Sequence, residues 1–225
     1  MLTIDWRTLY DAKDVLLAGM SITFQITAVA ILCGLALGTV LAVLSLSPYR
    51  LLRNGAQAYV ALFRSIPLVM LLLWFFLIVP QFLKALFDLP SSIDVRLISA
   101  LVAYSLLEAA FFCEIIRAGI GSLPRGQMYA AQALGMTPMQ AMRYVILPQA
   151  FRAMVPVALT QCIVIFLDTS LVYVIALGDF FRRMTAIGER DGTLIPMLLF
   201  AGATYWAVST TLIATTRLIQ TRWAR

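Results

Sequence analysis

Two carboxylic acids lie inside long apolar segments of this sequence. Glu108 and Asp168 are both flanked by hydrophobic residues, and Asp168 is followed by Thr169 and Ser170, whose hydroxyls can accompany it. A carboxylate in a membrane span is costly and is by default a functional hypothesis, because it can pair with the ammonium group of an amino acid. Arg64 could bind the carboxylate of the same molecule, or it could merely anchor a helix end. A structural role for both acids, as polar contacts between helices, remains open.

The sequence lacks the residues that most enzymes and metal sites use. It has no histidine, and its three cysteines (Cys33, Cys113 and Cys162) are dispersed among apolar stretches. Histidine is the commonest general base and metal ligand, and dispersed cysteines suggest neither a disulfide framework nor a metal cluster. The sequence also contains no G-x-x-x-x-G-K-[ST] phosphate-binding loop. We therefore expect no catalytic residue, no metal and no cofactor in this chain.

The elements that must position these residues are membrane-spanning helices. Hydrophobic side chains make up 62% of the 225 residues and charged ones 12%, against about 45–50% and about 25% in soluble domains. This composition predicts an all-α integral membrane protein. A spanning helix needs ~20 mainly apolar residues. Five stretches qualify, at about 15–46, 56–86, 95–116, 139–177 and 194–219.

Prolines and charges refine this expectation. We expect kinks at Pro67 and Pro80 in the second stretch and a break near Pro148 in the fourth. Ten of the 17 Lys and Arg residues fall on the side that holds the segments after spans 1 and 3 and the tail. The positive-inside rule places that side in the cytoplasm, so segment 1–14 is predicted to be periplasmic and tail 221–225 cytoplasmic. This asymmetry explains the net charge of +6 without nucleic-acid binding.

The loop between the third and fourth stretches, about 120–137, carries the clearest local signals. Residues Arg125 to Leu134 are rich in good helix formers, and Gly135 follows where a helix commonly ends. Thr137-Pro138-Met139-Gln140 then matches a capping box. Met128, Ala131 and Leu134 share one face of the short helix by their i, i+3 spacing. That helix could lie in a groove of another protein or pack on its own bundle, and spacing alone favours neither.

This loop resembles the signature loop of the permeases of ABC importers. The pattern is Glu-Ala-Ala, then Gly, then a hydrophobic residue and Leu-Pro, and Tyr129 replaces the leading Glu. The matching residues are Ala130, Ala131, Gly135, Ile146, Leu147 and Pro148. Two further stretches, 114–120 and Arg125-Gly126-Gln127, resemble the polar amino acid branch, as does Phe63-Arg64-Ser65-Ile66-Pro67. The segments 167–174, 179–182 and 187–193 look like those of glutamate/aspartate permeases.

The resemblance implies the fold and the role of the chain. It implies a five-span type I ABC importer transmembrane domain over 15–220, with a cytoplasmic coupling helix between spans 3 and 4. The residues implied in coupling to the ATPase are Arg125, Gly126, Gln127, Tyr129, Ala130, Ala131, Gly135, Leu147 and Pro148. Arg64, Glu108, Asp168, Thr169 and Ser170 are the candidates for the substrate pathway.

The same resemblance implies partners that this chain does not contain. These are a second homologous or identical permease, a dimer of ATP-binding subunits that holds ATP and Mg, and a periplasmic substrate-binding protein, all at a bacterial inner membrane. Glutamate and aspartate are the expected substrates. Glutamine or basic amino acids are the alternative, and an ATP-independent secondary transporter is a more distant one, because such proteins often show internal repeats and this sequence shows none.

Overall fold

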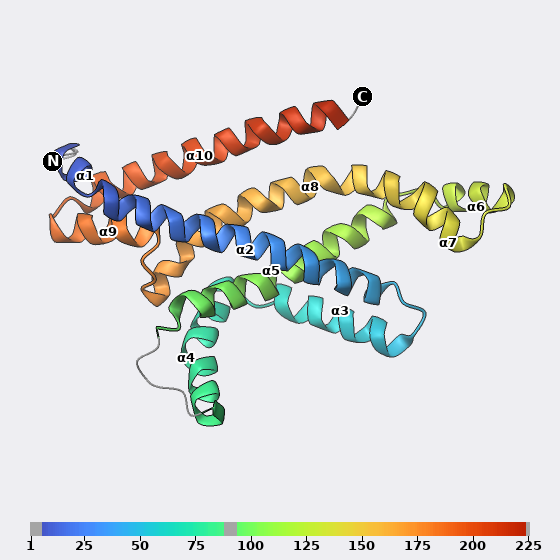
Figure 1. Cartoon of the computed structure of the whole chain (residues 1–225), viewed down its shortest axis with the longest axis horizontal. Helices are drawn as coiled ribbons and strands as arrows, with labels where there is room; N and C mark the ends of the chain where they lie inside the picture. The colour runs from blue at the N-terminus through green and yellow to red at the C-terminus, as the bar shows by residue number, and fades with distance from the viewer. Residues whose placement is uncertain (1–5, 88–93, 224–225) are drawn as a thin grey trace.

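The computed structural model describes residues 6–87 and 94–223, and every regular element within them is helical (Figure 1). The α-helices are α1 (Trp6–Asp11), α2 (Lys13–Ser45), α3 (Arg50–Arg64), α4 (Leu68–Phe87), α5 (Arg96–Gly121), α6 (Arg125–Ala133), α7 (Pro138–Ala141), α8 (Leu147–Asp168), α9 (Phe180–Arg190) and α10 (Leu194–Trp223). A π-helical turn, η1 (Met142–Ile146), precedes α8, and a 3₁₀ segment, η2 (Thr169–Ile175), follows it. Parts of the predicted terminal segments, 1–5 and 224–225, lie outside the described residues.

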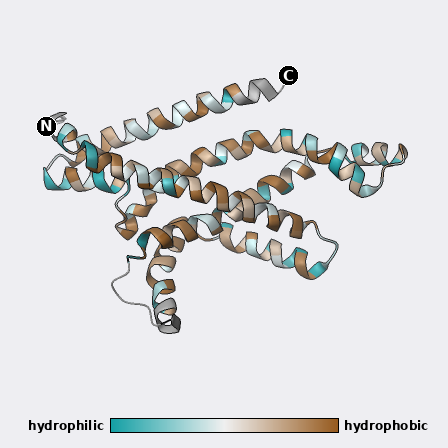
Figure 2. Cartoon of the chain, in the orientation of Figure 1, coloured by the Kyte–Doolittle hydropathy of each residue, from teal (hydrophilic) through white to brown (hydrophobic). Residues whose placement is uncertain are grey.

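The helices include enough long apolar ones to form a membrane bundle. Lys13–Ser45, Arg96–Gly121, the continuous segment Pro138–Ile175 and Leu194–Leu218 are each long and apolar enough to cross a bilayer. The bent pair of α3 and α4 makes a fifth crossing if it is counted as one broken span. Hydrophobic residues cover most of the length of these helices (Figure 2). The predicted all-helical membrane fold is therefore confirmed.

Helices α2 and α5 form the centre of the bundle, where their backbones approach closely. Gly34 and Gly38 of α2 are buried against α5. A Cβ atom at Gly34 would lie 2.7 Å from the Cβ of Glu108, and one at Gly38 would lie 2.7 Å from the Cβ of Phe112. Small residues four positions apart permit this close packing in membrane proteins. The contact holds α5, with its acidic residues, in a fixed position.

The second predicted stretch is two helices rather than one. Helices α3 and α4 meet at an angle of 99°, with the break at Ser65, Ile66 and Pro67. Proline has no N–H to continue a helical ladder and restricts the residue before it, so the kink predicted at Pro67 is present as a sharp corner. Pro80, the other predicted kink, lies inside the continuous helix α4. The corner places Arg64 at the end of α3.

The break predicted near Pro148 is wrong, because the chain stays helical there. The ring of Pro148 would clash with the carbonyl group of Tyr144 in a regular α-helix. The π-helical turn Met142–Ile146 comes directly before α8 and widens the helix at this point. One helical segment therefore runs from Pro138 to Ile175. It ends at Ala176, whose φ of 53° is left-handed.

Helix α9 lies at the opposite end of the molecule from α6 and α7 (Figure 1). Its N-cap is Asp179, whose buried carboxylate accepts hydrogen bonds from the backbone N–H groups of Phe181 (3.1 Å) and Arg182 (3.0 Å). Burial raises the pKa of Asp179 to about 6, although these N–H donors and the nearby Arg183 oppose the shift. An ionised Asp179 is therefore costly in the folded protein.

Replacing Asp179 by Asn is expected to remove a pH dependence of stability. The pKa of Asp179 in the folded chain lies above the value of about 3.9 in an unfolded chain, so its stabilising contribution is lost as pH rises from about 4 to about 6. Asn caps helices as well as Asp does. The free energy of unfolding of Asp179→Asn, relative to that of the wild type, should be higher at neutral pH than at acidic pH by on the order of 1–3 kcal/mol. Melting of both proteins in detergent at about pH 4.5 and about pH 7.5 measures this. If the difference in melting temperature between the two proteins were the same at both pH values, the raised pKa of Asp179 would be contradicted.

Candidate coupling loop and charged groove

The short helix α6 ends in a fixed turn. Gly135 has a φ of +84°, which favours glycine. Its N–H donates to the carbonyl oxygen of Gln132 (2.9 Å), and the N–H of Met136 donates to that of Ala131 (3.1 Å). These two bonds define a Schellman motif, which satisfies carbonyl groups at the end of a helix. The predicted helix end at Gly135 is confirmed.

The next helix begins at the capping box that the sequence predicts. The hydroxyl oxygen of Thr137 accepts from the N–H of Gln140 (3.3 Å), and the side-chain oxygen of Gln140 accepts from the N–H of Thr137 (2.9 Å). Pro138 occupies the first helical position. Only Gly135 and Met136 separate these two caps, so little freedom is left between α6 and α7.

One face of α6 packs on its own bundle, and the other is open. Ala131 is 3% exposed, and Met128 is partly buried beside Met142 and Ile146. Leu134, which the i, i+3 spacing grouped with them, is instead 81% exposed. The open face carries the exposed residues Arg125, Gly126, Gln127, Tyr129 and Ala130. The helix therefore packs on its own chain along one face and leaves the other exposed.

A side-chain contact joins α6 to the start of α8. The amide nitrogen of Gln149 donates to the side-chain oxygen of Gln127 (3.4 Å) and to the carbonyl oxygen of Val145 (2.9 Å). Leu147 and Pro148, the other residues implied in coupling, are exposed next to this contact. The structure thus gathers the nine implied coupling residues on α6, its terminal turn and the start of α8.

The predicted pathway residues divide into separate groups. Glu108 is 2% exposed and accepts a hydrogen bond from the amide of Gln161 (3.0 Å), so it joins α5 to α8. The hydroxyl of Tyr104 donates to the backbone carbonyl of the half-buried Asp168. The hydroxyls of Thr169 and Ser170 donate to carbonyl groups one turn back on their own chain. The contact of Glu108 is that of a polar link between helices.

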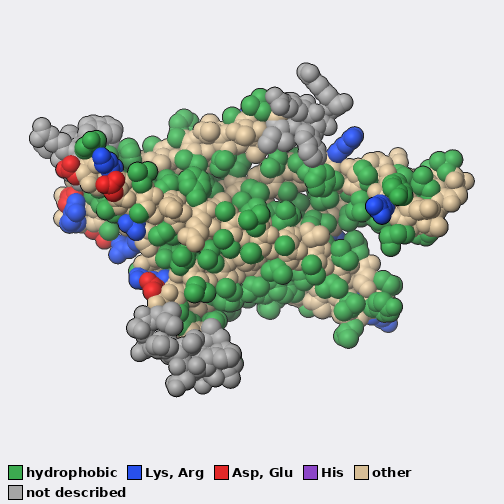
Figure 3. All heavy atoms as spheres, in the orientation of Figure 1, with side chains coloured by type: hydrophobic (Ala, Val, Ile, Leu, Met, Phe, Trp, Pro, Cys, Tyr) green, Lys and Arg blue, Asp and Glu red, His purple; other side chains and the backbone are tan. Residues whose placement is uncertain are grey.

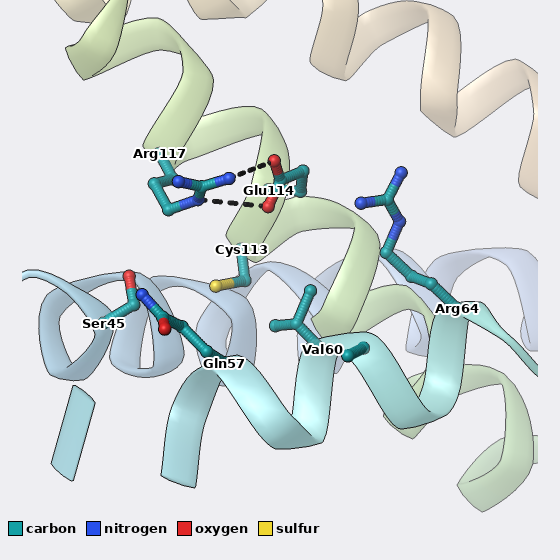
Figure 4. A pocket seen from close by; sticks show the side chains of 8 residues that line it. Ser45, Gln57, Val60, Arg64, Cys113, Glu114 and Arg117 are labelled. Atoms are coloured by element: carbon teal, nitrogen blue, oxygen red, sulfur yellow. Dashed lines mark hydrogen bonds and ion pairs between the residues drawn. The ribbon is translucent and has the colours of Figure 1, made fainter. Parts of the chain in front are cut away.

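Arg64 belongs to a different place, a groove between α3, α5 and the end of α2. The groove has a volume of about 400 Å³ (Figure 4). Its lining residues are Ser45, Gln57, Val60, Ala61, Arg64, Cys113, Glu114 and Arg117. Glu114 and Arg117 are functional candidates that were not among the pathway residues predicted from the sequence. Their i, i+3 spacing of opposite charges was the available signal.

The described residues contain no group of three or more His, Cys, Asp or Glu side chains arranged to hold a metal ion. Four ion pairs are present among the described residues, and Glu114 with Arg117 is one of them.

Known proteins of one family share this architecture. Residues 34–225 match the family model described as "Binding-protein-dependent transport system inner membrane component". The chain therefore belongs to this family, the permeases of ABC importers. The family inferred from the loop motif is confirmed.

Three known proteins are similar to this chain over nearly its whole length. The chain is 56% identical over 209 residues to the glutamate/aspartate import permease protein GltK of Escherichia coli O157:H7, covering 93% of each protein. It is 33% identical to the arginine transport system permease protein ArtQ of Bacillus subtilis (strain 168), covering 92% of this chain and 91% of the relative. A chain in the crystal structure of an amino acid ABC transporter with histidines superposes with a TM-score of 0.88 at 27% identity, covering 98% of this chain and 99% of that one.

Proposed function

We propose that this chain is a permease subunit of an ATP-driven importer of glutamate and aspartate. The observation that carries the proposal is the 56% identity to GltK over 93% of both chains. Helix α6 supports it, because this helix is capped and has one exposed face. A rigid helix transmits the motion of a docked ATPase, whereas a flexible loop would absorb it. Glutamine or basic amino acids remain the alternative cargo, and the similarity to ArtQ is the observation that favours the latter.

The importer needs partners that supply the energy and the substrate. Two ATP-binding subunits, which hold ATP and Mg, dock at α6 of this chain and at the matching loop of a second permease. A periplasmic binding protein delivers the amino acid to the end formed by α9. ATP binding brings the two loops together and opens the pathway outward, and hydrolysis reverses this. Within this scheme Arg64, Asp168, Thr169 and Ser170 belong to the pathway, and Glu108 holds α5 to α8.

The charge distribution supports one orientation in the inner membrane. On the face shown in Figure 3, acidic side chains appear only toward the end formed by α1 and α9, whereas Lys and Arg appear at both ends. Ten of the 17 Lys and Arg residues belong to the segments after spans 1 and 3 and to the tail, and cytoplasmic segments are enriched in Lys and Arg. The end that holds α6 and α7 therefore faces the cytoplasm, where ATPase subunits are found, and the α9 end faces the periplasm.

Purification with partners, followed by reconstitution, tests this function. The tagged chain is extracted in mild detergent, and the proteins that accompany it are identified by mass spectrometry. We expect an ATPase and a second permease in near-stoichiometric amounts. Liposomes that contain this complex and the binding protein should import glutamate and aspartate only with internal ATP. Import of glutamine or arginine instead would replace the substrate, and transport by the chain alone would overturn the importer assignment.

A further inference from the structure

The 3₁₀ segment η2 is attached to α5 at both of its ends. At its start, the hydroxyl of Tyr104 donates a hydrogen bond to the backbone carbonyl of Asp168. At its other end, Nη1 of Arg96 donates to the carbonyl oxygen of Ala176 (3.0 Å), the residue that follows η2. This end of the long helix lies away from α6 and leads into α9 (Figure 1). Helix α5, which packs closely on α2, therefore holds the far end of the long helix at two points.

The two attachments differ in their access to water. Tyr104 is fully buried, so breaking its bond would leave a buried hydroxyl without a partner, which is costly. The side chain of Arg96 is 40% exposed, and Ala176 is exposed as well. Water can therefore replace the contact between Arg96 and Ala176 at little cost. The bond of Arg96 is the one of the two that can open when the protein changes shape.

A carboxylate keeps Arg96 aimed at the carbonyl of Ala176. Oδ2 of Asp94 accepts from Nη2 of Arg96 (2.7 Å), and Oδ1 accepts from Nε (2.9 Å). This two-pronged contact fixes the plane of the guanidinium group and leaves Nη1 for Ala176. Oδ1 also accepts from the backbone N–H of Arg96 (3.0 Å), so Asp94 is held at the start of α5. When the bond to Ala176 opens, Arg96 keeps its counterion and no unpaired charge is left.

The backbone of Ala176 has an unfavourable conformation. Its φ of 53° is left-handed, a region in which non-glycine residues are uncommon because of steric crowding. Such a conformation persists only where the surrounding structure holds it. Here the N–H of Ala176 donates to the carbonyl oxygen of Tyr173 (2.9 Å), and its own carbonyl is held by Arg96. The corner between η2 and α9 is therefore poised to relax when the bond of Arg96 opens.

We propose that Arg96 is a latch, whose bond to Ala176 holds the periplasmic end of the long helix against α5 in the resting importer and opens when ATP brings the coupling loops together. The proposal rests on the function proposed above. A displacement of α6 reaches Ala176 through the continuous helix Pro138–Ile175. Thr169 and Ser170, two candidates for the substrate pathway, lie in η2 between the attachments, so opening the latch frees the segment that carries them. Arg96 is thus a positioning residue and not a ligand of the amino acid.

Hydrolysis of ATP in the absence of the binding protein tests the latch. It is measured on liposomes that contain the complex of this chain with its permease partner and its ATPase. Arg96→Gln removes the latch, so the outward-open state is reached more easily and hydrolysis should rise about threefold or more. Arg96→Lys keeps the charge but loses the planar fork, and should fall between them. Lys13→Gln is the control. It removes an exposed positive charge from the same side of the membrane, where the amine lies 4.6 Å from the ring centroid of Tyr10, and should hydrolyse ATP as the wild type does.

Substitutions of Ala176 test the latch without changing a charge. Glycine adopts a left-handed φ without steric cost, whereas the β-branched valine is strongly disfavoured there. Ala176→Gly should therefore stabilise the closed corner and lower hydrolysis without the binding protein, and Ala176→Val should raise it, each by about threefold. These two variants decide the question if Arg96→Gln does not assemble. A purely structural contact would lower the melting temperature without raising hydrolysis, so melting curves accompany each measurement.

The latch is wrong if Arg96→Gln hydrolyses ATP no faster than the wild type, if Lys13→Gln shows the same rise, or if both Ala176 variants shift the rate in one direction. Import by the wild type separates the two proposals. If the wild-type complex imports glutamate with the binding protein and internal ATP, but one of these results is found, the latch fails and the proposed function stands. If the wild type contains no ATPase and imports nothing, the proposed function fails, and the latch fails with it.

Discussion

Replacing Gly135 by proline abolishes amino acid import while the chain still inserts and associates with its permease partner. Gly135 has a φ of +84°, and proline is confined to about −65°. Proline also removes the N–H that donates to Gln132 and disfavours the helical conformation of Leu134 before it. The turn between α6 and α7 must therefore rearrange, and α6 loses its orientation. ATP-driven uptake into liposomes, with assembly checked by size-exclusion chromatography, measures the effect.

A second substitution at the same position is the control. Asn adopts left-handed conformations more readily than other non-glycine residues and retains the N–H, so Gly135→Asn should keep most of the import. Loss of transport in Gly135→Pro together with retention in Gly135→Asn assigns the effect to the backbone of the turn. Normal import by Gly135→Pro would show that the orientation of α6 does not couple this chain to its ATPase.

Replacing Gly38 by valine should strongly destabilise the bundle. A Cβ atom at this position would lie 2.7 Å from the Cβ of Phe112, 2.8 Å from the carbonyl oxygen of Ala109 and 3.0 Å from the N of Cys113. Two of these three atoms belong to the backbone of α5 and cannot move independently of it. Overpacking in a core costs about 1–3 kcal/mol and sometimes more, and the rigid backbone places this site at the upper end. We expect little monodisperse protein in detergent and a much lower melting temperature.

Gly202 of α10 provides the matched control for Gly38. It also lies within an apolar helix, but an added Cβ atom would meet nothing within 4 Å. Gly202→Val has the same intrinsic helix preference as Gly38→Val and should express and melt like the wild type. Equal behaviour of the two variants would contradict the close α2 and α5 contact.

The parts of the fold that depend on local signals could be predicted from the sequence. The helix end at Gly135 and the capping box at Thr137 follow from residue types a few positions apart, and both are present. Long apolar stretches likewise predict membrane helices whatever their neighbours are. The G-x-x-x-G spacing of Gly34 and Gly38 was a further local signal of the α2 and α5 contact that the sequence argument did not use.

The features that depend on packing between distant segments could not be predicted. The 99° corner at Pro67 is set by where α4 packs, and proline alone fixes no angle. The contact of Glu108 with Gln161 joins residues 53 positions apart. The groove that holds Arg64 and Glu114 exists only because α3 folds back along α5. For the same reason the sequence grouped Arg64 with Asp168, whereas the structure places Arg64 with Glu114 and Arg117.

The uninterrupted helix from Pro138 to Ile175 has a mechanical consequence. At about 1.5 Å per residue its 38 residues form a rod about 55 Å long, with the α6 turn at one end and η2, which contacts α4 and α9, at the other. A break at Pro148 would have made a hinge, whereas the π-helical turn Met142–Ile146 keeps the chain helical through this point. A displacement of α6 is therefore transmitted along this helix to the far end of the molecule. Its direction is set by the pivot where α8 crosses α5, close to Gly119.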